Sequence, residues 1–210
     1  ELFEEKFELL LQLNNEQPIT WNGNFRPALD NIQIYPKPLN GKLLIWRAVG
    51  QHFASAIQAG KMGVPMNLAA LYGSSSVFEK RVTAYRNVAK ESGHDPEKLP
   101  IAVATMMYID KDSQTAFKNY YPYLNNTFNQ IRGVDFPKEQ YREATNIKNS
   151  IMVGSPQQII EKILYQYELF GHQRFIVQMD HGNIPYKKVV EMIEMFATEV
   201  APVIRKATRK

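Results

Sequence analysis

LLIWRAVGQHFASAIQAGKMGVPMNLAALY, residues Leu43–Tyr72, is the stretch that decides the fold. The apolar runs Leu43–Val49 and Val64–Tyr72 have the length and composition of buried strands, and apolar residues between them recur at helical spacing. Two nearly all-apolar strands joined by a helix predict a βαβ unit in a parallel sheet that is covered on both faces. Ligands of such sheets bind where strands end, so the turn after Val49 is the first place to look for function.

The same alternation of strand and helix continues along the chain. An amphipathic helix at Glu1–Asn14 and a hairpin come first, and later strands are predicted at Leu99–Ile109 and Arg174–Met179. Further helices are predicted at Val77–Ser92, Gln114–Ile131, Pro156–Phe170 and Tyr186–Lys206, with a break at Pro202. Repeated βα units indicate an α/β protein, either an open doubly wound sheet or a TIM-type (β/α)8 barrel. Four strands make half of such a barrel, and a chain that begins at Glu1 instead of Met is expected to be a fragment.

Length and composition exclude several classes of protein. The chain has 210 residues, no cysteine and a formal net charge of +4. We expect a single domain over 1–210 without disulfides or thiolate metal sites, and a cytoplasmic location agrees with the absence of cysteine. Basic residues are spread along the chain, so we expect no nucleic-acid partner. No segment is apolar enough for a membrane span, so we expect no membrane contact.

One segment has little periodicity of either kind. Residues Arg132–Ser150 are polar and are interrupted by Gly133 and Pro137. A connection of this length is typical of a lid or of a disordered segment. We therefore expect 132–150 to be a mobile, lid-like insertion within the domain.

Several pieces of the sequence, in their order and spacing, carry a family resemblance. They are FEEKFELL with ITWNG, RAVG…SAIQAGKMGVP, YRNVAKESGHDPEKLP, RGVDFPKEQYRE, VGSPQQIIEKI…FGHQRFIVQMD and MFATEVAPVIRK. Together they resemble the carboxyl-terminal part of the bacterial luciferase-like flavin-dependent monooxygenases. The resemblance covers nearly the whole chain, and VGSPQQII followed by an apolar strand is its most diagnostic piece.

The resemblance implies a fold and an activity. The four strands would be the fifth to the eighth of the barrel, and the enzyme would oxidise a small organic substrate with reduced FMN, or a deazaflavin, and O2. A flavin reductase would be a possible partner. The catalytic acid–base residue would lie upstream of Glu1, so this fragment alone is expected to be inactive.

The resemblance also places the flavin phosphate at the turn after Val49. By position the cofactor-binding residues would be Gly50, Gln51, His52 and Ser55. Independently of the family, unpaired amides and the dipole at a helix start favour an anion. The sequence departs from the commoner family pattern, which has a second Gly and a Thr-Pro after the first Gly, and Phe53 could crowd the site. The alternative is an ordinary βα turn with an incidental glycine.

Two further residues follow strands on the same rim. Tyr72 is a candidate to flank the flavin ring or substrate, and His181 is a candidate to touch substrate or flavin. The alternatives are a tyrosine packed on its neighbours and an ordinary strand exit. The four histidines lie on separate turns without the spacing of metal ligands, so we expect no metal site.

Two other functions stay open at this point. One is a different barrel enzyme that binds a phosphorylated substrate at the same rim, and the other is a non-catalytic fragment that acts through oligomerisation. A half barrel leaves its first and last strands unpaired and bares apolar surface. We therefore expect a homo-oligomer, or association with the other half of the barrel.

Overall fold

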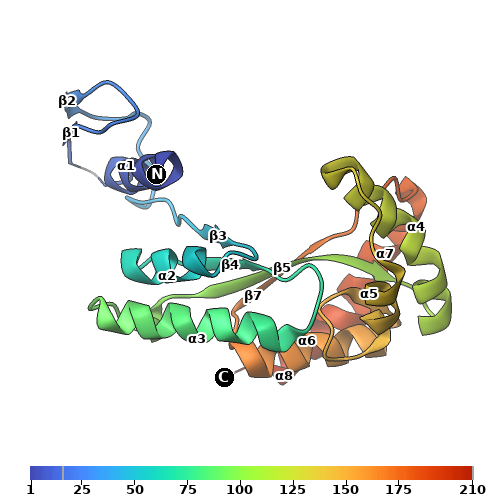
Figure 1. Cartoon of the computed structure of the whole chain (residues 1–210). Coiled ribbons are helices and arrows are strands. Elements are labelled where there is room, and N and C mark those ends of the chain that lie inside the picture. The colour runs from blue at the N-terminus through green and yellow to red at the C-terminus, as the bar shows by residue number, and fades with distance from the viewer. Residues whose placement is uncertain (16, 210) are drawn as a thin grey trace. The chain divides into compact units, whose positions relative to one another are not determined.

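The computed structural model describes residues 1–15 and 17–209. They form two compact units, Glu1–Trp46 and Arg47–Lys210 (Figure 1). The single domain that we expect over 1–210 stays a prediction.

The first unit is a helix with a small antiparallel hairpin. Helix α1 spans Leu2–Leu13, and strands β1 (Ile19–Trp21) and β2 (Leu29–Ile32) pair with each other. The unit buries Leu9, Ile19 and Trp21 in one cluster, as expected for the apolar face of an amphipathic helix. The predicted first helix and the predicted hairpin are both confirmed.

The second unit is built on a parallel sheet. Its strands are β3 (Arg47–Val49), β4 (Met66–Ala69), β5 (Ile101–Ile109), β6 (Met152–Gly154) and β7 (Arg174–Gln178). Strands β3, β4, β5 and β7 lie in this order, and each is parallel to the next. The short β6 pairs with the last residues of β5. The four predicted strands and their parallel arrangement are therefore confirmed, whereas β6 was not predicted because three residues are too short for a periodic signal.

The first two strands are shorter than predicted. Residues 43–46 lie outside β3, and β4 begins only at Met66. The partner strand explains the start of β3, because the Arg47 N–H donates to the Pro65 carbonyl at 2.8 Å and the pairing register begins at Arg47 and Met66. Residues before Arg47 have no β4 residue opposite them, so an apolar run of seven residues gives a strand of three.

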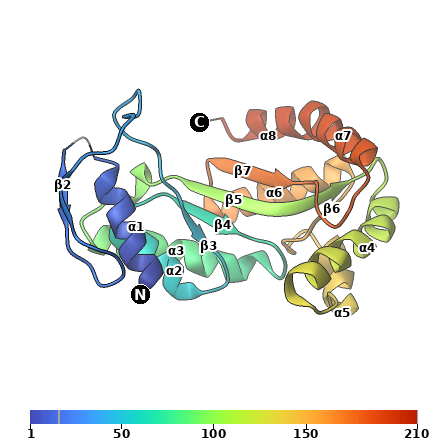
Figure 2. The same ribbon diagram turned by 90° about the horizontal axis from the view of Figure 1, so that it is seen from above.

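Helices account for most of the remaining residues of the second unit. They are α2 (Phe53–Met62), α3 (Ser75–Glu91), α4 (Ser113–Arg132), α5 (Lys138–Arg142), α6 (Pro156–Phe170), α7 (Tyr186–Met195) and α8 (Ala201–Ala207). Short turns of 3-10 helix lie at Pro96–Lys98 (η1) and Glu143–Thr145 (η2), and a π-helical segment η3 lies at Phe196–Val200. Helices α2, α3 and α6 lie side by side against one face of the sheet (Figures 1 and 2).

The two faces of the sheet differ in their side chains. Val49, Met66 and Leu68 point to the helices and are fully buried. The opposite face carries the aligned residues Ala48, Asn67, Ala102 and Arg174 in one row and Ala69, Ala104 and Ile176 in the next. Ala48 is exposed there and Ile176 is 41% exposed. The expected cover on both faces is therefore missing at Ala48 and Ile176, whereas near the end of β5 the same face is covered, because Tyr108 stacks on Tyr120 and Tyr123 of α4.

Local signals place the helix ends correctly. Asp112 accepts a hydrogen bond from the Thr115 N–H at 2.7 Å, and Ser155 accepts one from the Gln158 N–H at 3.4 Å, so both act as N-caps. The predicted break near Pro202 is also found, because the helix passes through the π-helical segment η3 before α8.

Helices α4 and α6 have different places in the fold. Helix α6 packs against α3 and β5, while α4 packs against β6 and the end of β5. The insertion between β5 and β6 thus includes α4 as well as the residues Arg132–Ser150.

Candidate functional site

The carboxyl ends of β3, β4, β5 and β7 lie at the same edge of the parallel sheet. The residues that follow these strands are Gly50–His52, Ala70–Gly73, Asp110 and Met179–His181. Binding sites of parallel α/β proteins form at this edge.

The turn after β3 leads directly into the first turn of α2. His52 is the N-cap residue, with an extended backbone (φ −77°, ψ 114°), and its side chain makes no capping hydrogen bond. Gln51 and His52 are exposed, and Gly50 and Ser55 are half-buried. The Ser55 N–H donates to the His52 carbonyl at 3.1 Å, and the amides that precede it have no side-chain cap. This turn can therefore accept an anion.

A buried arginine supports this turn from α3. Arg81 is 9% exposed, and its Nη2 donates to the Gln51 carbonyl at 2.7 Å. Its Nη1 donates to the Val77 carbonyl at 2.8 Å, so the side chain is fixed between α3 and the turn. Because the carbonyl and the N–H of a trans peptide point in opposite directions, the His52 N–H points away from Arg81. The contact of Arg81 with this turn could not be identified from the sequence, because no local pattern connects Arg81 to residue 51.

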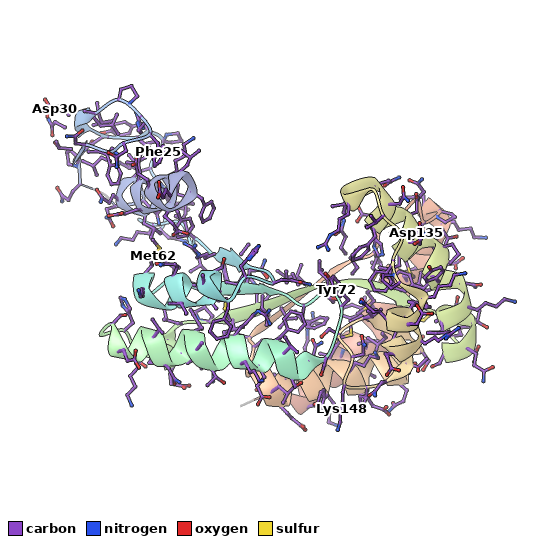
Figure 3. All side chains as sticks on the ribbon, viewed as in Figure 1. Phe25, Asp30, Met62, Tyr72, Asp135 and Lys148 are labelled. Atoms are coloured by element: carbon purple, nitrogen blue, oxygen red, sulfur yellow. The ribbon has the colours of Figure 1, made fainter. Side chains whose placement is uncertain are left out.

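The turn after β4 is closed by the insertion. Tyr72 is labelled in Figure 3. It packs edge-on against Phe128 and Phe136, with ring centroids 5.5 and 5.7 Å away, and its Oη accepts a hydrogen bond from Arg132 Nη1 at 3.3 Å. The first amide of α3, Ser75 N–H, donates to the Lys148 carbonyl at 2.8 Å. Tyr72 thus has the packed environment that was the alternative to a substrate contact, and the start of α3 is less available than the start of α2.

The end of β5 is occupied by an ion pair. Asp110 Oδ2 lies 2.6 Å from Lys188 Nζ, and this ammonium group also lies over the Tyr108 ring at 5.4 Å from its centroid. Burial raises the pKa of Tyr108 to about 12. These groups are paired with each other, and the sequence analysis did not single them out.

His181 lies after β7 but is buried in an aromatic cluster. It is 5% exposed, and its Nε2 lies 2.9 Å from the Tyr120 Oη of α4. Burial lowers the pKa of His181, opposed by the Gln178 backbone and the charge of Asp180. Burial also raises the pKa of Tyr120 well above its ordinary value. The histidine is therefore held neutral beside a neutral tyrosine.

The predicted site residues are not brought together. Strands β4 and β5 lie between β3 and β7, and three strand spacings of about 4.8 Å place the ends of β3 and β7 roughly 14 Å apart. Within the described residues, Gly50–Ser55 lies at one edge of the row β3-β4-β5-β7 and His181 at the other. The structure thus separates the cofactor residues expected from the sequence from His181.

Comparison with known proteins identifies the family. The family described as luciferase-like monooxygenase matches residues 1–173 of this chain. The chain belongs to the luciferase-like monooxygenase family. This membership does not favour the alternatives of an unrelated barrel enzyme or a non-catalytic interaction module.

A curated relative is similar to part of this chain. The alkanal monooxygenase alpha chain of Aliivibrio fischeri is 27% identical over 168 residues, which are 68% of this chain and 47% of the relative. The chain thus spans about half the length of the curated relatives that it matches.

Among solved structures, monooxygenase RslO1 from Streptomyces bottropensis has a TM-score of 0.81 at 20% identity, covering 96% of this chain and 60% of its own. An F420-dependent secondary alcohol dehydrogenase has a TM-score of 0.70 at 20% identity, with coverage of 96% and 60%. The oxygenating constituent of 3,6-diketocamphane monooxygenase of Pseudomonas putida, in complex with FMN, has a TM-score of 0.60 at 18% identity, with coverage of 96% and 62%. These similarities show a shared α/β fold.

Gly50, at the end of β3 in this luciferase-like chain, does not have a positive φ. A Cβ on Gly50 would have no atom within 4 Å. The fold itself therefore does not require glycine there, and the open space in front of residue 50 is compatible with a bound anion. The Phe53 side chain is exposed and is not packed into the core.

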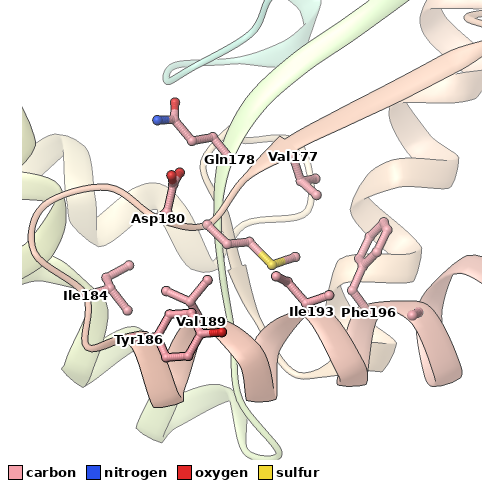
Figure 4. A pocket seen from close by; sticks show the side chains of 10 residues that line it. Val177, Gln178, Asp180, Ile184, Tyr186, Val189, Ile193 and Phe196 are labelled. Carbon is pink, nitrogen blue, oxygen red and sulfur yellow. The ribbon is translucent and has the colours of Figure 1, made fainter.

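A cleft of about 670 Å³ lies between the end of β7 and α7 (Figure 4). Its apolar wall includes Val177, Ile193 and Phe196, and Gln178 and Asp180 add polar groups. Tyr186 and Ile193 at this cleft are 83% and 52% exposed. Asp180 lines the cleft, whereas its neighbour His181, the candidate from the sequence, does not.

Residues 1–15 and 17–209 contain no group of three His, Cys, Asp or Glu side chains placed to hold a metal ion. In the same residues no helix is long and apolar enough to cross a membrane.

Proposed function

We propose that this chain is part of a flavin-dependent monooxygenase, in which the turn Gly50–Ser55 holds the phosphate of reduced FMN. The observation that carries this proposal is the start of α2, which has no side-chain cap and lies at the carboxyl end of a parallel strand in a luciferase-like protein. When bound, reduced flavin supplies the electrons with which O2 oxidises a small organic substrate.

The residues of the turn suit a phosphate group. The His52 N–H points away from Arg81, and the N-terminal end of α2 adds a favourable dipole. The Ser55 hydroxyl, on the first turn of α2, can donate one further hydrogen bond. Similar structures are named for FMN or for F420, so a deazaflavin with its own phosphate is the alternative cofactor.

The barrel and its assembly are further parts of the proposal. We propose that β3, β4, β5 and β7 are the fifth to eighth strands of a (β/α)8 barrel in the whole protein. The outer edges of β3 and β7 and the apolar cleft beside α7 would then be covered by the other half or by a second copy. A catalytic residue outside this chain, a flavin reductase partner and a cytoplasmic location complete the proposal.

Fluorescence titration of the complete protein with FMN and with riboflavin tests the phosphate site. We expect FMN to bind much more tightly than riboflavin, which has no phosphate. Ser55→Ala should weaken FMN binding by roughly 1.5–3 kcal/mol, the range for a hydrogen bond to a charged group. His52→Ala should have a smaller effect because its main-chain N–H remains, and Gly50→Val should abolish FMN binding by filling the space of the anion.

The riboflavin titration is the matched control. Riboflavin affinity should hardly change in Ser55→Ala. Equal affinity of the unmodified protein for FMN and riboflavin would contradict a phosphate site at this turn.

A further inference from the structure

Helix α6 contains a fully buried lysine that is paired with no acid among residues 1–15 and 17–209. The Lys162 side chain is 0% exposed, and its Nζ donates to the carbonyl oxygens of Ala144 at 2.6 Å, Ile151 at 2.9 Å and Asn149 at 3.2 Å. Lysine is almost never fully buried unless its charge is paired. Here three main-chain carbonyl dipoles take the place of the carboxylate.

The number of donors matches the number of acceptors. An ammonium group has three N–H donors, and each of the three carbonyl groups accepts one of them. The three acceptors lie in the segment 144–151, where the insertion returns to the sheet before β6. The Lys162 side chain on α6 therefore holds three main-chain carbonyl groups at the carboxyl-terminal end of the insertion.

The segment 144–151 also closes the turn after β4. Asn149 forms an antiparallel bridge with Ser74, and the Ser150 N–H donates to the Gly73 carbonyl at 2.8 Å. The Ser75 N–H at the start of α3 donates to the Lys148 carbonyl at 2.8 Å. The segment thus occupies the end of α3 that would otherwise present free amides.

A second residue of α6 holds the same junction from the other side. Gln166, one helical turn after Lys162, donates from Nε2 to the Ser75 Oγ at 3.3 Å. The Ser75 Oγ also lies 3.1 Å from the Ser150 Oγ. Lys162, Gln166, Ser75 and Ser150 are all fully buried, so these bonds are shielded from competing water.

We propose that Lys162 is an internal latch, a cation on α6 that positions residues 144–151 and thereby keeps the turn after β4 closed beside Tyr72. The latch sets the rim of the candidate site without touching a ligand, so it is a positioning residue. It does not depend on which cofactor the protein binds.

Hydrogen exchange of the full chain tests the latch. In Lys162→Met, which keeps the length and apolar stem of the side chain, the amides of Ser75, Ser150 and Ile151 should exchange at least tenfold faster. The amides of Val103 and Thr105, in the centre of β5, should keep their protection. Lys187→Met, a change of an exposed lysine on α7, is the matched control and should change neither group.

Two results would overturn the latch. One is unchanged protection of Ser75 and Ser150 in Lys162→Met. The other is a loss of protection by the same factor throughout β5, because Lys162 would then be an ordinary core residue.

Chemical rescue tests the role of the charge, even if the variants fold poorly. Lys162→Ala leaves a space bordered by three carbonyl oxygens, and propylammonium chloride can supply the lost ammonium group and part of its stem. We expect added propylammonium to restore the protection of Ser75 and Ser150, or to restore folding measured by circular dichroism. Sodium chloride of equal ionic strength is the control, and an equal effect of the two salts would contradict the proposal.

Discussion

The turns after β3 and β4 begin in the same way and end differently. Each follows a short parallel strand, contains a glycine and leads into a helix within a few residues. The first turn leaves the start of α2 without a side-chain cap, whereas in the second the Ser75 amide is taken by the Lys148 carbonyl. The end of β5 is likewise occupied, by the Asp110–Lys188 pair. A helix start is therefore a candidate anion site only where the rest of the fold leaves it open.

The largest effect is expected where the helices behind the two turns meet. Helices α2 and α3 pack against each other at Gly60, where an added Cβ would lie 2.5 Å from the Tyr85 carbonyl oxygen and 3.1 Å from the Ala89 nitrogen. Both are backbone atoms, so Gly60→Val forces the helices apart and should destabilise the fold by about 3 kcal/mol. Urea unfolding followed by circular dichroism measures this. An unchanged midpoint would mean that neither turn depends on this contact.

The closed turn should also respond to pH through Lys162. Burial lowers the pKa of Lys162 to about 7, from an ordinary value of about 10.4 in the unfolded chain. Between these values the unfolded chain binds a proton that the folded chain does not, so the free energy of unfolding rises with pH. Below pH 7 Lys162 is the cation that donates to all three carbonyl groups. From pH 7 to 9.5 we expect a rise of up to about 1.4 kcal/mol per pH unit.

Urea unfolding at several pH values checks this slope, and Lys162→Met is the control that should remove it. The buried Tyr85 and Tyr108, whose pKa burial raises to about 12, act in the opposite direction above pH 10 and set the upper limit of the window. A slope of the same size in Lys162→Met would assign the effect to other groups.

Two matched serine variants sharpen the contrast between the turns. Ser75→Ala removes the hydroxyl that bonds to Gln166 and lies beside Ser150, and should destabilise the fold by about 1–2 kcal/mol because buried partners stay unsatisfied. Ser55→Ala, in the half-buried first turn of α2, should change stability by no more than about 0.5 kcal/mol. Thermal unfolding of both variants decides this, and equal losses would show that the two turns are equally packed.

The smallest effect is expected at Gly50. Its Cβ position is open and its φ is not positive, so Gly50→Ala should change the free energy of unfolding by less than about 0.5 kcal/mol. A larger loss would indicate that residue 50 is constrained by the fold, and the contrast with Gly60 would fail. Combined with the FMN titration, this variant separates an effect on binding from an effect on folding.

Much of the fold could be predicted from the sequence because its signals are local. Asp112 and Ser155 cap helices through residues three positions away, and Gly63, Gly133 and Gly171 end helices with a left-handed backbone. The lengths of β3 and β4 could not be predicted, since pairing with another strand sets them. The packing of α6 against α3 could not be predicted either, because it joins segments that are far apart in the sequence.

The candidate site likewise has features that the sequence shows and features that only the tertiary structure shows. The sequence by itself determined the turn Gly50–Ser55, the positions of Tyr72 and His181 after strands, and the order of pieces that marks the luciferase-like monooxygenase family. Only the tertiary structure decided that His181 is buried against Tyr120, that Tyr72 packs against Phe128 and that Arg81 supports the first turn. It also decided that Lys162 holds the second turn closed. The physical reason is that their partners, such as the Gln51 carbonyl for Arg81 and the Ala144 carbonyl for Lys162, lie 30 and 18 residues away along the chain, and only folding brings them within hydrogen-bonding distance.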